Sequence, residues 1–491
     1  MRITLDTSAP ADYLRFLEIK RLPRYSITGH VAEFPDEYAG RLGLAAEHQK
    51  TVKFKPGKSL FDYQRDIAKL AIEKRRFALF IDCGFGKTLI FLEFLQHAAA
   101  AMASGRRSLL ISPLMVIDQT ISEAMRFYGL ELPYIPGHDL QDWLNGKGKA
   151  RIAITNYESL RKELQPGKLG CLCLDESGGL KSHYGKYGRA AIELGRGLEW
   201  KLAGTGTPAP NDRIEFANHA VFLDQFPNVN SFLARYFVNK GQTQERWILK
   251  PHALRPFYRS LSHWSIFLTN PATYGWKDNC STIPPIHVHQ HHVPLTEEQE
   301  RLIMSKTRQL ITTQIGGIKN RTSLAMIAKG YYKGKSLHSH KPGFIRDLVA
   351  QWPDESTIIW CLYDREQDTI DAIFPDAASL RGSTPYEKRR DAIRDFQLGK
   401  RKQIVSKGKI LGFGLNLQMA TRQVFSGLQD SYEMFYQCVK RSNRIGSTLP
   451  LNVHIPVTDI EEPMIETVLK KAKRVQADSE EQEQIFKENR I

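Results

Sequence analysis

The sequence contains few cysteines, and their spacing excludes two kinds of cysteine-based architecture. They lie at Cys83, Cys171, Cys173, Cys280, Cys361 and Cys438. None of them forms a CxxC pair, so the sequence predicts neither a zinc module nor a disulfide framework. Because structural disulfides are rare in reducing compartments, we expect this protein in a reducing cytoplasm.

Long apolar runs are also missing. The chain has no run of 18 consecutive apolar residues, and residues 1–6 carry no apolar signal core. The sequence therefore predicts neither a membrane span nor a membrane partner. We also find no internal repeat, no long low-complexity tract, and no nuclease, methylase or zinc signature. Any such activity would have to come from a partner protein.

Apolar and positively charged residues are both plentiful. A hydrophobic content of 42% with 10% aromatics is ample for packed cores, and 491 residues give room for about three domains. Lys and Arg outnumber Asp and Glu by 69 to 53, a formal net charge of +16. A field of this sign favours a polyphosphate partner such as nucleic acid. The alternative is a basic surface that is simply solvated.

Short apolar runs alternate with helical patterns in two groups, which is typical of buried strands in parallel sheets. The first group comprises residues 77–81, 109–111, 152–154, 171–174 and 201–203. The second comprises residues 357–361, 403–405, 423–425 and 453–457. The predicted fold class is therefore α/β, with two parallel-sheet lobes in tandem over residues 51–212 and 286–470.

The segment between the lobes, residues 213–285, is rich in aromatics and mixed charge and is predicted to be mostly helical. Its aromatics either form a small core or stack on bases; large aromatics usually bury, which favours the core. Prolines at 284 and 285 mark its end. The histidines that follow, at 287, 289, 291 and 292, alternate as in a strand and lack neighbouring carboxylates or thiols. We therefore favour a strand over a metal site.

A phosphate-binding loop is the strongest local signal. The sequence Asp82-Cys-Gly84-Phe-Gly86-Lys87-Thr88 follows a predicted strand and opens an apolar helix. Glycines let backbone N–H groups surround phosphates at a helix N-terminus. Lys87 would neutralise the β- and γ-phosphates, and the Thr88 hydroxyl would ligate Mg²⁺. The first glycine of the usual pattern is missing, since Ile81 occupies its position. ATP and Mg²⁺ are thus the predicted cofactors.

A carboxylate pair supplies the second half of an ATPase site. Asp175 and Glu176 directly follow the apolar run 171–174, 88 residues after Lys87. Asp175 would hold Mg²⁺ through water, and Glu176 would orient and deprotonate the attacking water. Taken alone, an Asp-Glu pair is more often a solvated turn, but here the two halves of the site support each other.

These motifs resemble those of superfamily 2 helicases, and within them the Swi/Snf-type DNA translocases, over most of the chain. Gln64 in Leu60-Phe-Asp-Tyr-Gln64 resembles the adenine-reading Q motif, and the loop with Gly84 and Gly86 is similar to motif I, which also lacks the first glycine. Asp175-Glu176-Ser-Gly resembles motif II, with Ser-Gly in place of the familiar Ala-His. Motifs Ia, Ib and III would supply DNA contacts at Ser112, Pro113, Thr155, Asn156, Thr205 and Thr207.

The second lobe carries the remaining resemblances. The sequence Gly412-Phe-Gly414-Leu-Asn416-Leu is similar to motif V, which implies Gly414 at the nucleotide and Asn416 at the DNA. The stretch Gln437 to Gly446 resembles motif VI, which implies Gln437 at the nucleotide. Arg441 and Arg444 would then act as arginine fingers on the γ-phosphate. On an isolated sequence, this i, i+3 pair would more often be a solvated helix face.

A narrower likeness is to compact DEAD/DEAH-like helicases of bacteriophages and prophages. It is carried by residues 61–67, 79–84, 155–158 and 247–252. It implies a bacterial host cytoplasm, with phage or host replication, recombination or repair proteins as partners. Residues 1–50 are basic with a helical spacing of apolar residues, and we expect an accessory DNA-binding segment, a lobe-docking segment or a packing extension. Residues 471–491 alternate in charge and predict an exposed helix.

Three functions stay open at this stage. The favoured one is an ATP-driven translocase that moves along duplex or branched DNA with little sequence specificity. The second is a strand-separating helicase on forks, D-loops or R-loops. The third is a DNA-binding scaffold that holds nucleotide as a switch without useful turnover, against which Glu176, Arg441 and Arg444 argue. The motifs do not distinguish DNA from RNA.

Overall fold

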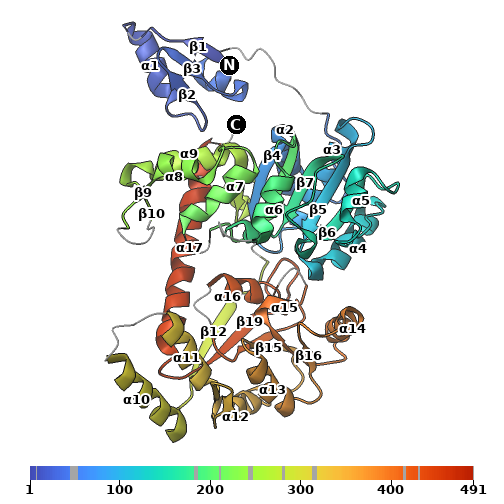
Figure 1. The fold of residues 1–491 in the computed structure, drawn as a ribbon, viewed down its shortest axis with the longest axis vertical. Coiled ribbons are helices and arrows are strands. Elements are labelled where there is room, and N and C mark those ends of the chain that lie inside the picture. Colours follow the sequence, from blue (N-terminus) through green and yellow to red (C-terminus); the bar gives the residue numbers. More distant parts are fainter. Residues whose placement is uncertain are drawn as a thin grey trace. The chain divides into compact units, whose positions relative to one another are not determined.

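The computed structural model describes residues 1–6, 8–44, 53–181, 186–209, 212–241, 247–278, 282–311, 318–412, 416–428 and 432–489. The chain divides into two compact units, Met1–Asp278 with Ala477–Ile491, and Asn279–Gln476. Each unit is built on its own six-stranded sheet (Figure 1). The predicted fold class, two RecA-like parallel-sheet lobes in tandem, is confirmed.

The sheet of the first unit has the strand order β11-β4-β8-β7-β5-β6, and all its pairings are parallel. Its strands are nearly all buried, as expected when helices cover both faces. All five predicted strands are present; β11 was not predicted. The strands are β4 (Arg76–Ile81), β5 (Arg107–Ser112), β6 (Ile152–Asn156), β7 (Leu169–Asp175), β8 (Trp200–Thr205) and β11 (Ser265–Leu268).

Helix α2 precedes the first strand of this sheet, and the other helices lie between its strands in the sequence. The helices are α2 (Asp62–Lys74), α3 (Lys87–Ala101), α4 (Ile117–Tyr128), α5 (Leu140–Asn145) and α6 (Lys186–Leu194). Helix α3 is apolar nearly all round, and its buried residues include Phe91, Phe94 and Leu95. A helix of this kind must be enclosed by other elements. Its N-terminus is thereby fixed at the end of β4.

Residues 213–278 are mostly helical, with α7 (Phe216–Phe222), α8 (Val229–Tyr236) and α9 (Leu254–Trp264). A hairpin of β9 (Phe237–Asn239) and β10 (Trp247–Leu249) interrupts them. Their aromatics are largely buried in the same cluster as the residues of the first sheet, which confirms the core interpretation over base stacking; they include Phe232, Tyr236, Phe237, Phe257, Tyr258 and Trp264. The segment ends by adding β11 to the sheet, parallel to β4.

The sheet of the second unit has the order β12-β19-β18-β15-β17-β16, again with every pairing parallel. The four predicted strands of this lobe are confirmed, and β16 was missed. The strands are β12 (Ile286–His292), β15 (Thr357–Cys361), β16 (Ala378–Leu380), β17 (Gln403–Lys407), β18 (Arg422–Phe425) and β19 (Leu451–Val457). The helices between them are α10 (Glu297–Ile311), α11 (Ile318–Ala328), α12 (Lys341–Val349), α13 (Asp364–Ile373), α14 (Tyr386–Gln397), α15 (Gly408–Leu411) and α16 (Tyr432–Val439).

The histidine tract forms strand β12, as predicted. His289 and His291 stack on His454 of the neighbouring strand, with ring centroids 4.8 and 5.3 Å apart, and His454 stacks on Trp352. Burial, together with the charges of the neighbouring histidines and Arg422, lowers the pKa of His454 to about 4. Within the described ranges, no three His, Cys, Asp or Glu side chains are placed to share a metal ion.

The first 44 residues form a small module. Strands β1 (Arg2–Thr4), β3 (Val31–Glu33) and β2 (Ser26–Thr28) make an antiparallel sheet beside α1 (Pro10–Ile19) and the short helix η1 (Asp36–Leu42). The module has its own apolar cluster, which includes Leu5, Ile19 and Phe34. The helix agrees with the predicted apolar spacing, whereas three-residue strands leave no periodic signal in the sequence.

This module contacts the first sheet's helices through buried polar groups. The Tyr38 hydroxyl lies 2.8 Å from Nδ1 of His263, and Lys74 Nζ pairs with Glu37 at 2.5 Å. Burial lowers the pKa of His263 to about 4, so its ring is neutral near pH 7. Glu37 has its pKa lowered to about 2, because His263 and Lys74 outweigh the opposing effect of burial. These contacts fit the docking alternative for the N-terminal segment.

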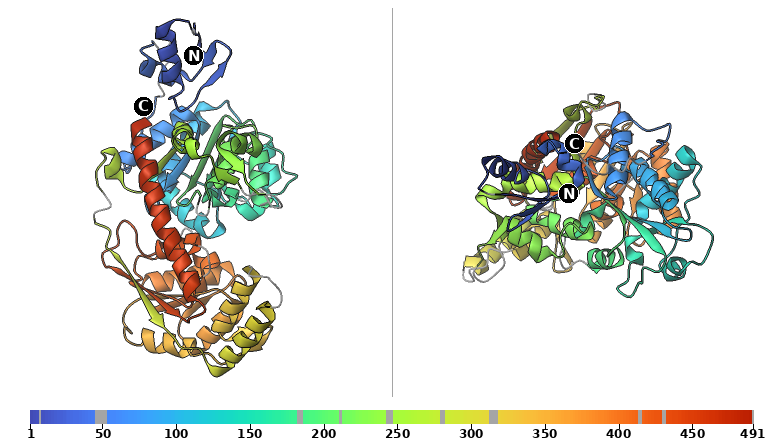
Figure 2. Two further views of the ribbon diagram at one scale, coloured as in Figure 1. Left: turned by 90° about the vertical axis from the view of Figure 1, so that its left-hand side faces the viewer. Right: turned by 90° about the horizontal axis from the view of Figure 1, so that it is seen from above.

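The C-terminal residues form one long helix, α17 (Glu462–Asn489), uninterrupted in Figure 2. The predicted helix is confirmed, but its predicted exposure is wrong near its end. Gln482, Glu483, Ile485 and Phe486 are buried, and the Phe486 ring lies 5.0 Å from that of Phe267 in β11. The sequence predicted exposure because charged residues dominate this stretch, and the two apolar residues at 485 and 486 form no periodic pattern.

Within the described part of the chain, no helix combines the length and the apolar character that crossing a membrane requires.

Candidate nucleotide and nucleic-acid site

The predicted motifs of the first lobe lie at the carboxyl ends of its strands. Ile81, Ser112, Asn156, Asp175 and Thr205 are the last residues of β4, β5, β6, β7 and β8. In a parallel sheet these ends share one edge, which is where α/β proteins bind ligands. The fold therefore brings motifs that are up to 141 residues apart in the sequence (64 to 205) to one edge of one sheet.

The phosphate-binding loop has the backbone that a phosphate cradle requires. Gly84 and Gly86 have φ values of +92° and +68°, a region that glycine adopts without strain. Helix α3 begins at Lys87, whose ammonium donates to the carbonyl oxygens of Ile81 at 2.9 Å and Asp82 at 3.3 Å. Lys87 is thus held at the loop by neutral acceptors, which phosphate oxygens would replace. Thr88 follows in the first turn of α3.

The Q-motif residues support this loop from α2. The Gln64 amide and the Tyr63 hydroxyl both donate to the carbonyl oxygen of Phe85, at 3.0 and 3.1 Å. Gln64 Oε1 accepts from the backbone N–H of Phe61 at 2.9 Å, which fixes the start of the helix. A Cβ on Gly86 would overlap the Gln64 amide, which would have to leave this position, and the positive φ of Gly86 itself favours glycine. Contact of Gln64 with an adenine base stays a prediction.

The carboxylate pair ends strand β7. Asp175 Oδ2 accepts from Ser112 Oγ at 3.1 Å, and Asp175 Oδ1 accepts from the backbone N–H of Glu176 at 3.0 Å. Glu176 adopts φ = +48°, which is uncommon for a residue with a side chain and is costly unless the surroundings hold it. The chain therefore leaves the extended conformation of β7 at Glu176.

The charge of this pair fits a site for a divalent cation. Burial, and then the charge of Glu176, raise the pKa of Asp175 to about 6, and Lys87 only partly opposes them. A cation at the carboxylates would relieve that cost, and oxygen donors are the ligands that Mg²⁺ prefers. Asp175 and the Thr88 hydroxyl would hold Mg²⁺ that arrives with the nucleotide.

Tyr157 supports the strained turn, a role that the sequence did not indicate. Its hydroxyl donates to the carbonyl oxygen of Asp175 at 2.7 Å, the carbonyl of the same peptide whose N–H is held by the Asp175 side chain. Both ends of that peptide are therefore fixed. A second support follows at Ser177, whose Oγ lies 3.0 Å from Nε2 of His219 in α7. Both contacts join residues far apart in the sequence and so leave no local signal.

Replacing Tyr157 with Phe removes one hydrogen bond and no ring contact. Loss of this hydrogen bond should destabilise the catalytic conformation of the Glu176 turn by about 1 kcal/mol. That energy corresponds to about a fivefold fall in kcat. Nucleotide affinity should change little, because the hydroxyl bonds to the Asp175 carbonyl and not to the phosphate loop. Steady-state ATP hydrolysis checks this. A fall in affinity with an unchanged kcat would contradict the support that we assign to Tyr157.

Several predicted DNA-contact side chains are buried and make internal hydrogen bonds. Ser112 bonds to Asp175, the Thr155 hydroxyl donates to the Ile135 carbonyl at 2.7 Å, and Asn156 accepts from the Ser159 N–H at 3.1 Å. Thr205 and Thr207 are also buried. These side chains brace the loops at the strand ends. Pro113 is half-buried and precedes the exposed Leu114. Their contact with DNA stays a prediction.

In the second unit, motifs V and VI are joined by backbone. The N–H of Leu417, next to the exposed Asn416, donates to the Arg441 carbonyl at 3.0 Å. Arg441 is 3% exposed and its Nε donates to the carbonyl of the buried Gln437 at 3.1 Å, whereas Arg444 is half-buried. The predicted nucleotide contact at Gly414 lies outside the described residues.

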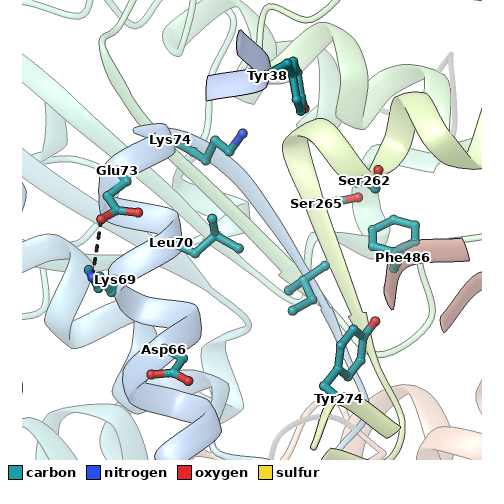
Figure 3. Close-up of a pocket in the computed structure, with 11 residues that line it drawn as sticks. Tyr38, Asp66, Lys69, Leu70, Glu73, Lys74, Ser262, Ser265, Tyr274 and Phe486 are labelled. Atoms are coloured by element: carbon teal, nitrogen blue, oxygen red, sulfur yellow. Dashed lines mark ion pairs between the residues drawn. The ribbon is translucent and has the colours of Figure 1, made fainter. Parts of the chain in front are cut away.

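A cavity of about 240 Å³ lies elsewhere in the first unit, beside α2. Figure 3 shows the α2 side chains Asp66, Lys69, Leu70 and Glu73 facing it, with Lys69 Nζ 3.9 Å from Glu73 Oε1. Its other walls come from the N-terminal module, the 213–278 segment and α17, at Tyr38, Ser262, Ser265, Tyr274 and Phe486. Its lining includes neither the Lys87 loop nor the Asp175–Glu176 pair, so it is not the phosphate site.

Comparison with protein families identifies two domains. The SNF2-related domain matches residues 63–337, and the helicase conserved C-terminal domain matches residues 340–446. The first match covers the loop, the carboxylate pair and the 213–278 segment. The second covers Arg441 and Arg444. No curated protein matches the chain.

Two solved structures are similar to the chain. One is the Sulfolobus solfataricus SWI2/SNF2 ATPase core in complex with double-stranded DNA, with 20% identity, a TM-score of 0.40, and coverage of 89% of this chain and 97% of that one. The other is the Pyrococcus furiosus Hef helicase domain, with 14% identity, a TM-score of 0.45, and coverage of 83% of this chain and 98% of that one.

Proposed function

This chain belongs to the SNF2-related family, Swi/Snf-type members of superfamily 2, and from that premise we propose that it moves along duplex DNA as it hydrolyses ATP. It is a DNA-dependent ATPase of the helicase and translocase class. The observation that best supports a working motor is the buried Asp175 and the strained Glu176 beside the Lys87 loop. A scaffold without turnover has no need of a carboxylate held at such cost.

The proposed chemistry assigns one task to each residue of the first lobe. Lys87 and the loop N–H groups bind the β- and γ-phosphates, and Gln64 reads the adenine. Mg²⁺, when bound with ATP at Thr88 and Asp175, neutralises phosphate charge. Glu176 orients the attacking water and accepts its proton. Tyr157 and Asp175 hold the Glu176 turn while this happens.

The second lobe completes the site in this proposal. Arg441 and Arg444 stabilise charge on the transferred phosphoryl group, and Gly414 and Gln437 contact the nucleotide. ATP then favours the state in which the lobes close on it, and hydrolysis releases that state. If each lobe holds the DNA backbone, the cycle gives stepwise motion. Residues 51–212 serve as the ATP-binding lobe, 286–470 as the C-terminal lobe and 213–285 as the insertion between them.

DNA contact is proposed for the loops at the strand ends, through Ser112, Pro113, Thr155, Asn156, Thr205, Thr207 and Asn416. Because the side chains of several of these are engaged internally, the backbone N–H groups of those loops are the better candidates for phosphate contacts. Contacts of this kind position DNA without reading its sequence. The proposed setting is a phage-infected or prophage-bearing bacterial cytoplasm, with replication, recombination or repair proteins as partners.

A triplex-displacement assay separates translocation from strand separation. A labelled third strand on a duplex should be released in an ATP-dependent manner, while a labelled fork of equal length stays paired. Release of the fork strand without displacement of the third strand would favour the helicase alternative. Failure of both, with ATP bound, would favour the scaffold.

A further inference from the structure

An arginine-rich surface lies in the first unit, away from the strand ends. One turn, residues 224–226, holds three arginines from three different elements. Asp224 pairs with Arg76 at 3.2 Å, and Gln225 Oε1 accepts a hydrogen bond from Arg24 at 2.6 Å. The Arg235 guanidinium carbon lies 6.0 Å from the centroid of the Phe226 ring. Arg24 comes from the N-terminal module, Arg76 from β4 and Arg235 from α8. The fold therefore gathers guanidinium groups from distant parts of the sequence.

This surface holds two groups of arginines, and the members of each group repel one another. Burial, together with the charges of Arg235 and Arg76, lowers the pKa of Arg24. Burial, with the charges of Arg21 and Arg255, likewise lowers the pKa of Arg259. Like charges at this range disfavour one another. We name the arginine cluster as the set that joins the N-terminal module to α8 and α9: Arg21, Arg24, Arg235, Arg255 and Arg259.

Carboxylates of the same chain offset the charge of the arginine cluster only at a distance, through Glu37 near Arg24 and Glu488 near Arg259. Among the described residues, none of its five guanidinium groups forms an ion pair with a carboxylate. Their contacts are neutral, since Arg24 donates to an amide and Arg235 lies 5.5 Å over the Tyr236 ring. All except the half-buried Arg259 are exposed. The positive charge is thus available to a partner.

The sequence around the cluster is also positively charged. Residues 226–277 contain a single acidic residue, Glu245, against seven basic ones at Arg235, Lys240, Arg246, Lys250, Arg255, Arg259 and Lys277. An ordinary solvated surface mixes both signs. The segment leads into β11, which is at the opposite edge of the sheet from β5 and β6. The surface is therefore separate from the ends of the strands that carry motifs Ia and Ib.

We propose that the arginine cluster binds the phosphate backbone of a nucleic acid, at a second site besides the motif loops. Guanidinium groups match phosphate bidentately and stay charged, which suits repeated backbone contact without sequence preference. Because the cluster is formed jointly by the N-terminal module and α8 and α9, the module would dock on this lobe in order to complete the site. The inference rests on the proposed function, since it takes DNA as the polymer.

The test measures duplex binding as a function of salt concentration for wild-type protein and for the triple variant Arg21→Gln, Arg24→Gln, Arg235→Gln. Each lost phosphate contact should reduce the slope of log affinity against log salt by about 0.9, so we expect a reduction of about 2 to 3. Affinity at moderate salt should fall by about tenfold or more. ATP hydrolysis without DNA should be unchanged, because no variant residue contacts the phosphate loop.

Two controls make the result decisive. The variant Lys388→Gln, Arg390→Gln, Arg394→Gln removes the same charge from α14 and should keep the wild-type slope. The variant Arg21→Lys, Arg24→Lys, Arg235→Lys keeps the charge and should also retain the slope. If the triple Gln variant has a lowered melting temperature, the single variants Arg21→Gln and Arg255→Gln carry the test, each with a slope change of about 1.

The outcomes separate this inference from the proposed function. A wild-type slope in the Gln variants, with DNA still bound, would overturn the second DNA site and leave the proposed motor activity unaffected. The same result is expected if the cluster binds an acidic protein and not DNA. A slope change of equal size in the α14 control would overturn the special role of the cluster. Absence of any DNA binding by the wild type would overturn the proposed function itself.

Discussion

Substitution of Glu176 with Gln should lower ATP turnover by at least about a hundredfold, because Gln cannot accept a proton from water. The isosteric amide keeps the shape of the turn and removes a negative charge near Asp175, whose pKa is raised by that charge. Binding of ATP and of DNA should therefore be retained or slightly strengthened. Single-turnover hydrolysis, together with separate measurements of nucleotide and DNA affinity, checks both parts.

The matched control is Glu163→Gln, an identical change at an exposed position of the same lobe. It should hydrolyse ATP at the wild-type rate. Unchanged turnover in Glu176→Gln would remove the assigned role of this carboxylate. Loss of ATP binding in the same variant would assign it to holding the nucleotide instead.

Removal of the motif VI guanidinium groups should have an effect of at least similar size. Arg444→Ala and Arg441→Lys should each reduce kcat by about 10³-fold, the lower end of the range for arginine fingers. KM for ATP should change much less, because the contact strengthens only as charge develops on the phosphoryl group. Lys at position 441 keeps the charge but lacks the planar fork.

Arg441 is buried and bonded to the backbone of α16, so its variant needs a test of folding. Arg390→Ala on the exposed face of α14 removes a guanidinium from the same lobe and should leave kcat unchanged. The melting temperature of each variant is compared with that of the wild type. A rise in KM alone, with kcat preserved in a stable variant, would contradict the arginine-finger assignment.

The sequence predicts strands best where they are continuously buried. The predicted strand 357–361 has the same bounds as β15, because a continuous apolar run bounded by turns has few alternatives. Strand β11 was missed, since it follows α9 at the next residue, with no turn signal between Trp264 and Ser265. Strand β16 was missed because three residues are too short to show a pattern.

The sequence predicts which loops form the candidate site, but it does not predict the hydrogen bonds between them. The order of strand ends follows from the topology, and the motifs mark those ends. The hydrogen bond from Tyr157 to the Asp175 carbonyl joins β7 to the residue after β6, and only the packed sheet brings these two elements together. The arginine cluster likewise depends on how a module of 44 residues docks. Such long-range pairs carry no local sequence signal.

The central claim is that duplex DNA drives this ATPase. The most direct measurement is steady-state ATP hydrolysis with no polymer, duplex DNA, single-stranded DNA and RNA, at low and moderate salt. We predict that duplex DNA gives the largest stimulation, that this stimulation weakens as salt rises, and that Glu176→Gln abolishes it. Equal hydrolysis with and without every polymer would contradict the claim.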